Sequence, residues 1–91
     1  MAAFLDRFSV RTAIVQKVMA ERDRQDGLWG SQINHSDAWW NVIASEENGE
    51  VAREVYEQNE ERLLVEIVQA CAVYLAWAEA LLQRGVNADN T

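Results

Sequence analysis

The sequence contains no proline and only four glycines among its 91 residues. Proline interrupts helices and glycine weakens them, so this composition favours long, uninterrupted helices. The single cysteine, Cys71, excludes an internal disulfide framework and a cysteine-rich zinc site. We therefore expect a reducing, cytoplasmic environment.

Positive charge is also scarce, with eight Lys and Arg against fifteen Asp and Glu and a net charge of −7. This balance argues against a nucleic-acid partner, because binding a phosphate backbone requires positive charge. An acidic protein can still bind a phosphorylated ligand if metal ions bridge the two. We expect no membrane partner, since residues 1–8 do not form a signal peptide and no stretch is expected to reach bilayer-spanning length.

The length of the chain predicts a single helical domain over residues 1–85, followed by a polar tail at residues 86–91. A chain this small buries only about 60–65% of its unfolded surface, so a lone monomer would be marginally stable. Hydrophobic residues nevertheless make up 49% of the sequence and include four Trp. This excess predicts a homo-oligomer.

Apolar residues recur at three- and four-residue spacing, which predicts an all-α fold of three main helices. We expect these helices over Ala3–Gln25, Ser36–Gln58 and Asn59–Arg84, with a loop over Gly27–His35. The second helix has Ser36 or Asp37 as its cap, and Asn59 caps the third. Gly85 is a natural residue just beyond a helix end. Apolar residues cover more than one face of the third helix, which again predicts a partner subunit.

Two short ladders of oxygen-bearing side chains are the most informative feature of the chain. Glu46 and Glu47 stand four and three residues before Glu50, so the three share a helical face. Glu66 and Gln69 are three residues apart on the next helix. Each of these helices therefore offers several oxygen atoms on one side.

The ladders lie in or beside apolar stripes. The predicted stripe on the second helix contains Trp40, Ile43, Glu47, Val51 and Val55. On the third helix, Glu66 borders a stripe made of Leu63, Ile67, Ala70 and Tyr74. Buried carboxylates are costly unless they are paired or bind metal, and two of them about 6 Å apart repel by about 3 kcal/mol at an effective dielectric near 20. Oxygen ligands of this kind suit a hard cation, Mg²⁺ or Mn²⁺.

Several other positions allow two interpretations. Trp29, flanked by Gly27 and Gly30, is either a lid over the core or a platform on which a ligand base stacks. The charged run at residues 21–26 is interpreted as a solvated last turn, and the lone His35 as structural or exposed. Gly49 inside a helix indicates close approach of another backbone or a ligand, or a loosely constrained surface.

A longer pattern joins these features, and it resembles the MazG-like family of the all-α nucleoside triphosphate pyrophosphatases. The pattern comprises Arg22-x-x-Gln25-x-x-x-Trp29-Gly30, His35, Trp39-Trp40, Glu46-Glu47-x-x-Glu50 and Glu66-x-x-Gln69. Fifteen residues separate Glu50 from Glu66, which is within the family's range, and the likeness covers about residues 11 to 84. A lone Glu-Glu-x-x-Glu would be weak, but the paired ladders with the upstream residues are more specific.

The resemblance implies Mg²⁺-dependent cleavage, with Mn²⁺ as an alternative, between the α and β phosphates of a nucleoside triphosphate. The products would be the monophosphate and pyrophosphate, in a house-cleaning role, and the protein would be a dimer or a dimer of dimers. The residues carried over by position are Glu47, Glu50, Glu66 and Gln69 for metal, Glu46 and Glu47 for catalysis, and Trp29, Gln25, Arg22, His35 and Lys17 for substrate.

Two departures from the family pattern leave alternatives open. Gln69 stands where the family has Asp, so it supplies a neutral oxygen and no base. The phosphate-binding Lys and Asn that often follow the last helix are missing, so Lys17, Arg22 or a neighbouring subunit must replace them. The alternatives are a MazG-like regulatory oligomer that binds nucleotide or metal with little turnover, and a purely structural protein whose glutamates form a solvated face.

The departure at Gln69 generates the first prediction. Gln69→Asp adds a negative charge where the family has one, so it tightens Mg²⁺ binding, leaves the fold intact, and holds or raises activity. Gln69→Leu weakens Mg²⁺ binding only modestly. Calorimetric Mg²⁺ titration, together with sedimentation, checks this expectation. Looser Mg²⁺ binding and a dissociated oligomer in Gln69→Asp would place Gln69 in a subunit interface instead.

Overall fold

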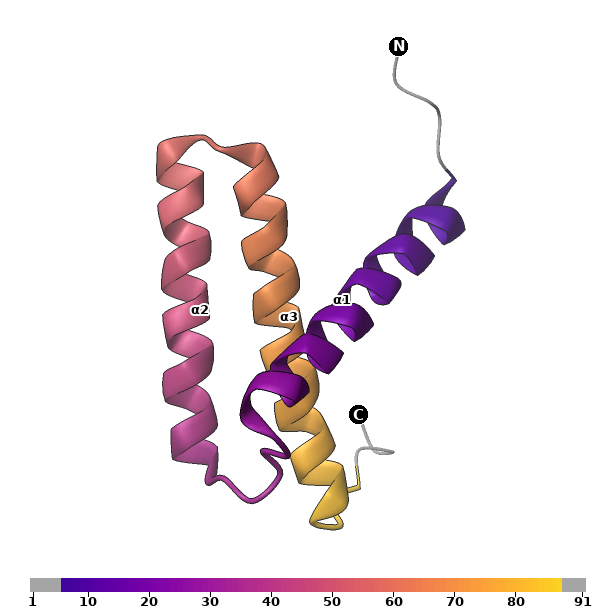
Figure 1. The fold of residues 1–91 in the computed structure, drawn as a ribbon, viewed down its shortest axis with the longest axis vertical. Coiled ribbons are helices and arrows are strands. Elements are labelled where there is room, and N and C mark those ends of the chain that lie inside the picture. The colour runs from indigo at the N-terminus through magenta and orange to yellow at the C-terminus, as the bar shows by residue number, and fades with distance from the viewer. Residues whose placement is uncertain (1–5, 88–91) are drawn as a thin grey trace.

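The computed structural model describes residues 6–87, and these residues form three helices and no strand (Figure 1). The helices are α1 (Arg7–Trp29), α2 (Asp37–Glu57) and α3 (Glu60–Gln83). Helices α2 and α3 form an antiparallel hairpin, while α1 packs on α3 and diverges from the hairpin toward its own N-terminus. The predicted all-α fold is confirmed. The predicted residues 3–5 of the first helix and residues 88–91 of the tail lie outside the described range.

Each helix begins after a side chain that caps its first turn. The Asp6 side chain accepts a hydrogen bond from the Ser9 backbone N–H at 2.9 Å. Ser36 accepts one from Trp39, and Asn59 one from Arg62, both at 3.1 Å. The predicted caps Ser36 and Asn59 are confirmed. Each cap satisfies a backbone donor that has no partner inside its helix.

The predicted boundary of the first helix is wrong at its C-terminal end. Helix α1 continues four residues past Gln25 and includes Gly27, so the connecting loop is shorter than expected. The helix ends at Trp29 and is capped by Gly30, whose φ of 72° is favourable for glycine and whose N–H donates to the Asp26 carbonyl at 2.8 Å. The end of α3 follows the prediction, because Gly85 adopts a φ of 90° beyond the last turn.

The core lies along the seam between α2 and α3. Its buried members are Trp40, Ala44, Val73, Ala76 and Ala80. The three alanines carry little volume, which lets the two helices approach closely.

The predicted apolar stripes are partly wrong. Val55, Ile67 and Tyr74 are 58%, 40% and 45% exposed, whereas Glu54 is buried. A helix completes a turn every 3.6 residues, so the face of α2 that begins at Trp40 passes through Ala44 and reaches Glu54 rather than Val55. The seam therefore becomes acidic at the end nearest the hairpin turn.

Gly49 lies on the exposed side of α2. A Cβ atom at this position would meet nothing within 4 Å among the described residues. No other backbone approaches it there, so of the two sequence-based interpretations the structure favours a loosely constrained surface over a close backbone contact.

Helix α3 corrects the expectation that no stretch reaches bilayer-spanning length. By length and composition, its 24 residues are apolar enough to cross a membrane. The core helix of a helical protein passes the same test, and seven residues of α3 are buried against the other helices. Length and hydropathy alone are therefore weak evidence for a membrane span here.

The alanine seam generates a prediction about packing. Ala44→Leu inserts a larger side chain between α2 and α3 and lowers the free energy of unfolding by about 1–3 kcal/mol. Urea unfolding followed by circular dichroism measures the loss. Ala52→Leu is the matched control, because Ala52 is exposed on the same helix. Equal stability of the two variants would contradict a close-packed seam.

Candidate metal centre

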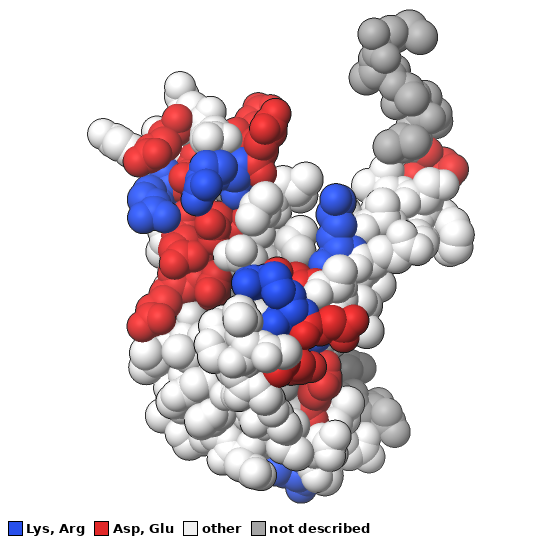
Figure 2. Space-filling view, in the orientation of Figure 1, with Lys and Arg blue, Asp and Glu red and all other residues white. Residues whose placement is uncertain are grey.

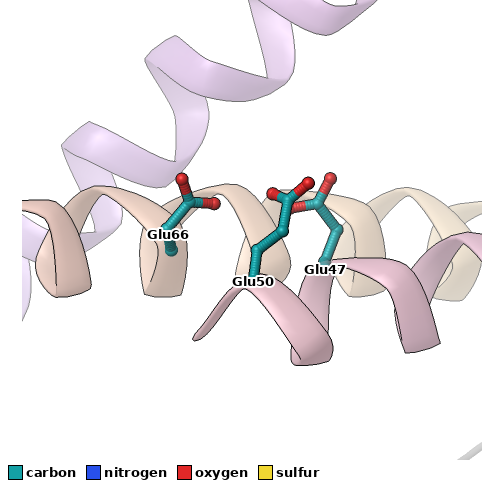
Figure 3. A group of neighbouring side chains, drawn as sticks. All are labelled: Glu47, Glu50 and Glu66. Atoms are coloured by element: carbon teal, nitrogen blue, oxygen red, sulfur yellow. The ribbon is translucent and has the colours of Figure 1, made fainter. Parts of the chain in front are cut away.

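Three carboxyl groups meet where α2 and α3 face each other (Figure 3). Glu47 and Glu50 come from successive turns of α2, and Glu66 comes from α3. One oxygen from each lies within 4.8 Å of the others. The structure therefore brings together three of the four predicted metal ligands.

Two of the three carboxyl groups have a buried oxygen atom that lacks a hydrogen-bond donor. Glu66 is 5% exposed. Its Oε2 atom and the Oε2 atom of Glu47 are buried and accept no hydrogen bond from the described residues. A buried acceptor without a partner costs about 1–3 kcal/mol, and more if it is charged. A bound cation would supply the missing partner, and carboxylate oxygens fit Mg²⁺ or Mn²⁺.

The electrostatics of the group follow from burial and from like charges. Burial, followed by the charges of Glu50 and Glu66, raises the pKa of Glu47 from 4.5 to about 7, and Glu21 and Glu46 add to the shift. Burial also raises the pKa of Glu66. A side-chain hydrogen bond with Glu50 and the negative charge of Glu50 raise it further. Both groups therefore hold protons unusually tightly when no cation is bound.

Sequence reasoning missed an ion pair between buried Glu54 and exposed Arg62 at the hairpin end of this site. Glu54 is 2% exposed, and its Oε2 atom accepts a hydrogen bond from Arg62 Nε at 3.1 Å. The Nη2 atom of Arg62 lies 3.8 Å from Glu66 Oε1. Helical spacing held a signal for both residues, because Glu54 follows Glu50 by four residues and Arg62 precedes Glu66 by four.

Helix α1 contributes a further carboxylate that the sequence reading missed. Glu21 accepts hydrogen bonds from Arg24 and from Gln25 Nε2, both at 2.8 Å for its Oε2 atom. The charge of Glu21 acts on Glu47, so Glu21 lies on the side of the three-glutamate cluster that faces α1. The spacing of four between Glu21 and Gln25 was the available signal.

The interpretation of residues 21–26 as a solvated turn is wrong for Arg22 and Gln25, which are both buried. The Nη1 atom of Arg22 donates to Gln25 Oε1 at 2.6 Å and to the Ala72 carbonyl at 3.2 Å. Its Nη2 atom forms an ion pair with Asp26. Arg22 thus attaches the end of α1 to the backbone of α3, which explains why the helix persists past Gln25.

A cavity of about 500 Å³ lies between the end of α1, the connecting loop and the start of α2. It is lined by Arg22, Gln25, Trp29, Gln32, His35, Trp39, Trp40, Ile43 and Val73. Four of the five predicted substrate contacts therefore share one cavity. His35 stacks on Trp39 with ring centroids 3.6 Å apart, and it shares a hydrogen bond of 2.7 Å with Gln32. Trp29 is 61% exposed, so it is not a lid over the core.

The cavity lined by these aromatic residues (the aromatic cavity) and the three-glutamate cluster are neighbours along α2. Ile43 lines the cavity one turn before Glu47, which corresponds to a rise of about 6 Å along the helix. Gln25 also lines the cavity and donates to Glu21, whose charge acts on Glu47. An elongated ligand in the cavity would therefore have its far end near the carboxylates.

The remaining predicted residues lie elsewhere. Lys17 and Gln69 line a different cavity of about 300 Å³ between α1 and α3, together with Glu21. Glu46 is exposed and is not one of the three clustered carboxylates. The metal-ligand role of Gln69 and the phosphate role of Lys17 stay predictions.

No family model, curated protein or solved structure matches this chain. The likeness to MazG-like proteins therefore stays a prediction that rests on the residues themselves. The geometry of the site carries the functional argument that follows.

The raised pKa values generate a prediction for the metal-free protein. Carboxyl groups that hold protons more tightly when folded stabilise the fold below their usual pKa of 4.5, and this stabilisation is lost as pH rises through the folded value. We expect the melting temperature in EDTA to fall from about pH 5 to about pH 8, the range in which Glu47 changes charge. Glu47→Gln flattens this slope.

The matched control is Glu57→Gln, since Glu57 is an exposed glutamate near the end of the same helix. This variant keeps the wild-type slope. Carboxyl groups whose pKa is lowered, such as Glu21 and Asp37, titrate below this pH range. A slope that survives in Glu47→Gln would show that another group controls the pH dependence.

Proposed function

We propose that this protein is a Mg²⁺-dependent nucleoside triphosphate pyrophosphohydrolase of the MazG-like kind. It would cleave the bond between the α and β phosphates and release a nucleoside monophosphate and pyrophosphate. The observation that supports the proposal most is the position of a partly buried three-carboxylate cluster one helical turn from an aromatic cavity. A triphosphate with a base at one end needs these two environments side by side.

Glu47, Glu50 and Glu66 would hold the metal through their clustered carboxylate oxygens. A bound Mg²⁺ or Mn²⁺ neutralises phosphate charge and lowers the pKa of a bound water. Gln69 would add a neutral oxygen, as the sequence pattern implies. The negative charges of the carboxylates repel a free triphosphate, so substrate binding would depend on the cation.

Glu47 is the best candidate for the group that accepts a proton from the attacking water. Glu47 lies at the end of the carboxylate cluster that is nearest the aromatic cavity, one helical turn after Ile43. Exposed Glu46 lies outside the clustered carboxylates, so it suits a supporting role in orienting water. The catalytic prediction therefore rests more on Glu47 than on Glu46.

The aromatic cavity would hold the nucleobase. Its volume falls in the range of small-molecule sites, and its lining combines aromatic rings with a few polar groups. Stacking of a base on an aromatic side chain contributes about 1–3 kcal/mol. Trp29 and the stacked pair of His35 and Trp39 offer ring faces, while Gln25 and Arg22 line the cavity with polar groups.

The surface supports the proposal of a homo-oligomer, a dimer or a dimer of dimers in the cytoplasm. Charged side chains gather near the α2–α3 turn, while much of the lower half of the same face carries no charge (Figure 2). Large apolar side chains are exposed on all three helices, including Phe8 and Met19 of α1, Val42 of α2, and Leu64 and Val65 of α3. Extended exposed apolar surface is typical of an interface.

The test is pyrophosphate release from a panel of nucleoside triphosphates, with and without Mg²⁺. We expect Mg²⁺-dependent turnover, and we expect Glu50→Gln and Glu66→Gln to lower kcat/KM by at least about a hundredfold, as loss of transition-state charge stabilisation does. Glu57→Gln, which changes an exposed glutamate outside the site, keeps wild-type activity.

Calorimetric titration with Mg²⁺ and with nucleotide separates the remaining possibilities. Binding of both ligands without pyrophosphate release would favour a regulatory oligomer with little turnover, which the neutral Gln69 also fits. If the protein neither binds metal nor releases pyrophosphate, the carboxylates have only a structural role and the proposed enzymatic function is wrong.

A further inference from the structure

The carboxylate group extends beyond its three clustered members. Glu54 continues the same face of α2 one turn after Glu50, and it is almost fully buried. Its carboxylate has one hydrogen-bond partner among the described residues, Arg62 of α3. A buried carboxylate with a single guanidinium beside it depends strongly on that positive charge.

The position of Arg62 is fixed by the turn that joins the two helices. Gln58 adopts a left-handed conformation at the end of α2, and Asn59 caps α3 by accepting the Arg62 N–H at 3.1 Å. The Asn59 N–H donates to the Glu54 carbonyl at 3.3 Å, which joins the two helix ends. The backbone therefore places Arg62 in the first turn of α3, beside the end of α2 that carries Glu54.

The Arg62 guanidinium lies between two carboxylates that belong to different helices. Its Nε atom is 3.1 Å from Glu54 Oε2, and its Nη2 atom is 3.8 Å from Glu66 Oε1. The side chain reaches this position from solvent, being 61% exposed, while the two carboxylates are buried. Only one oxygen of Glu66 faces Arg62, and its other oxygen, Oε2, has no hydrogen-bond partner among the described residues.

We propose that the Arg62 guanidinium occupies the place of a second divalent cation, and so limits the carboxylate site to one metal ion per chain. Glu54 and Glu66, the two carboxylates that Arg62 bridges, would form this second site if the positive charge of Arg62 were removed. The inference rests on the metal centre proposed above.

The charges explain why one fixed guanidinium has this effect. Four carboxylates line the seam at Glu47, Glu50, Glu54 and Glu66, and the covalently attached charge of Arg62 neutralises one of them. A second divalent ion would have to displace the guanidinium or share Glu54 and Glu66 with it. In the shared arrangement the metal ion and the guanidinium would repel each other strongly, because both would contact the same carboxylates. Arg62 is thus a positioning residue that sets how many ions bind.

The test is a Mn²⁺ titration of the full chain in which free Mn²⁺ is counted by electron paramagnetic resonance. The wild-type protein binds one Mn²⁺ per chain, and Arg62→Met binds two, with the first ion held at least about tenfold more tightly. Arg62→Lys keeps the charge and stays at one. In EDTA, Arg62→Met melts at a lower temperature than the wild type, and Mn²⁺ restores its melting temperature.

Two further variants assign the second ion. Adding Glu54→Gln to Arg62→Met removes a ligand of the second site and returns the count to one. Arg53→Met removes an exposed arginine that lies next to Glu54 in α2, and this variant binds the same number of Mn²⁺ ions as the wild type. Circular dichroism confirms that each variant retains its helices before its ions are counted.

The outcomes distinguish this inference from the proposed metal centre. One ion in both the wild type and Arg62→Met, with equal or weaker affinity in the variant, overturns the role of Arg62 and leaves the metal centre standing. No ion in either protein overturns both. Two ions in the wild type would show that Arg62 does not exclude the second cation.

Discussion

The structure depends on holding several negative charges together in a place that water does not reach freely. Glu47, Glu50 and Glu66 repel one another, and burial adds to the free energy needed to ionise Glu47 and Glu66. No attraction among the three carboxylates keeps these side chains together. The packing of α2 against α3 does so, because the alanine seam at one end and the capped turn at the other fix the spacing of the two helices.

Helix α1 completes the site and leaves much of its own apolar surface exposed. Its attachment is concentrated near its C-terminal end, where buried Arg22 donates to the Ala72 carbonyl of α3. The same turn directs Glu21 toward the carboxyl group and places Gln25 at the aromatic cavity. One anchoring residue thus links the two parts of the proposed nucleotide site. The first half of the helix carries exposed side chains such as Phe8, which suits contact with another copy.

The arrangement of acids and bases along the seam is graded. Toward the hairpin turn, Arg62 supplies a permanent positive charge to Glu54 and Glu66. Toward the aromatic cavity, Glu47 forms no ion pair among the described residues, since Arg24, whose charge acts on Glu47, is paired with Glu21 instead. The end of the seam without a direct ion pair is the one that faces the cavity. This gradient gives a phosphate-bridging cation a reason to bind at one end of the seam rather than along its whole length.

The sequence by itself determined the helices and their caps at Ser36 and Asn59, because capping and helical periodicity are local properties. It also identified Glu47, Glu50 and Glu66, since three- and four-residue spacings place side chains on one face of a helix. Only the tertiary structure decided which neighbouring face is buried, and it exchanged Val55 for Glu54 in the seam. The same holds for the Arg62 ion pair and for the aromatic cavity, whose walls come from segments that are distant along the chain. Local spacing fixes the direction of a side chain within its own helix, whereas its partners depend on how the helices turn and cross in space.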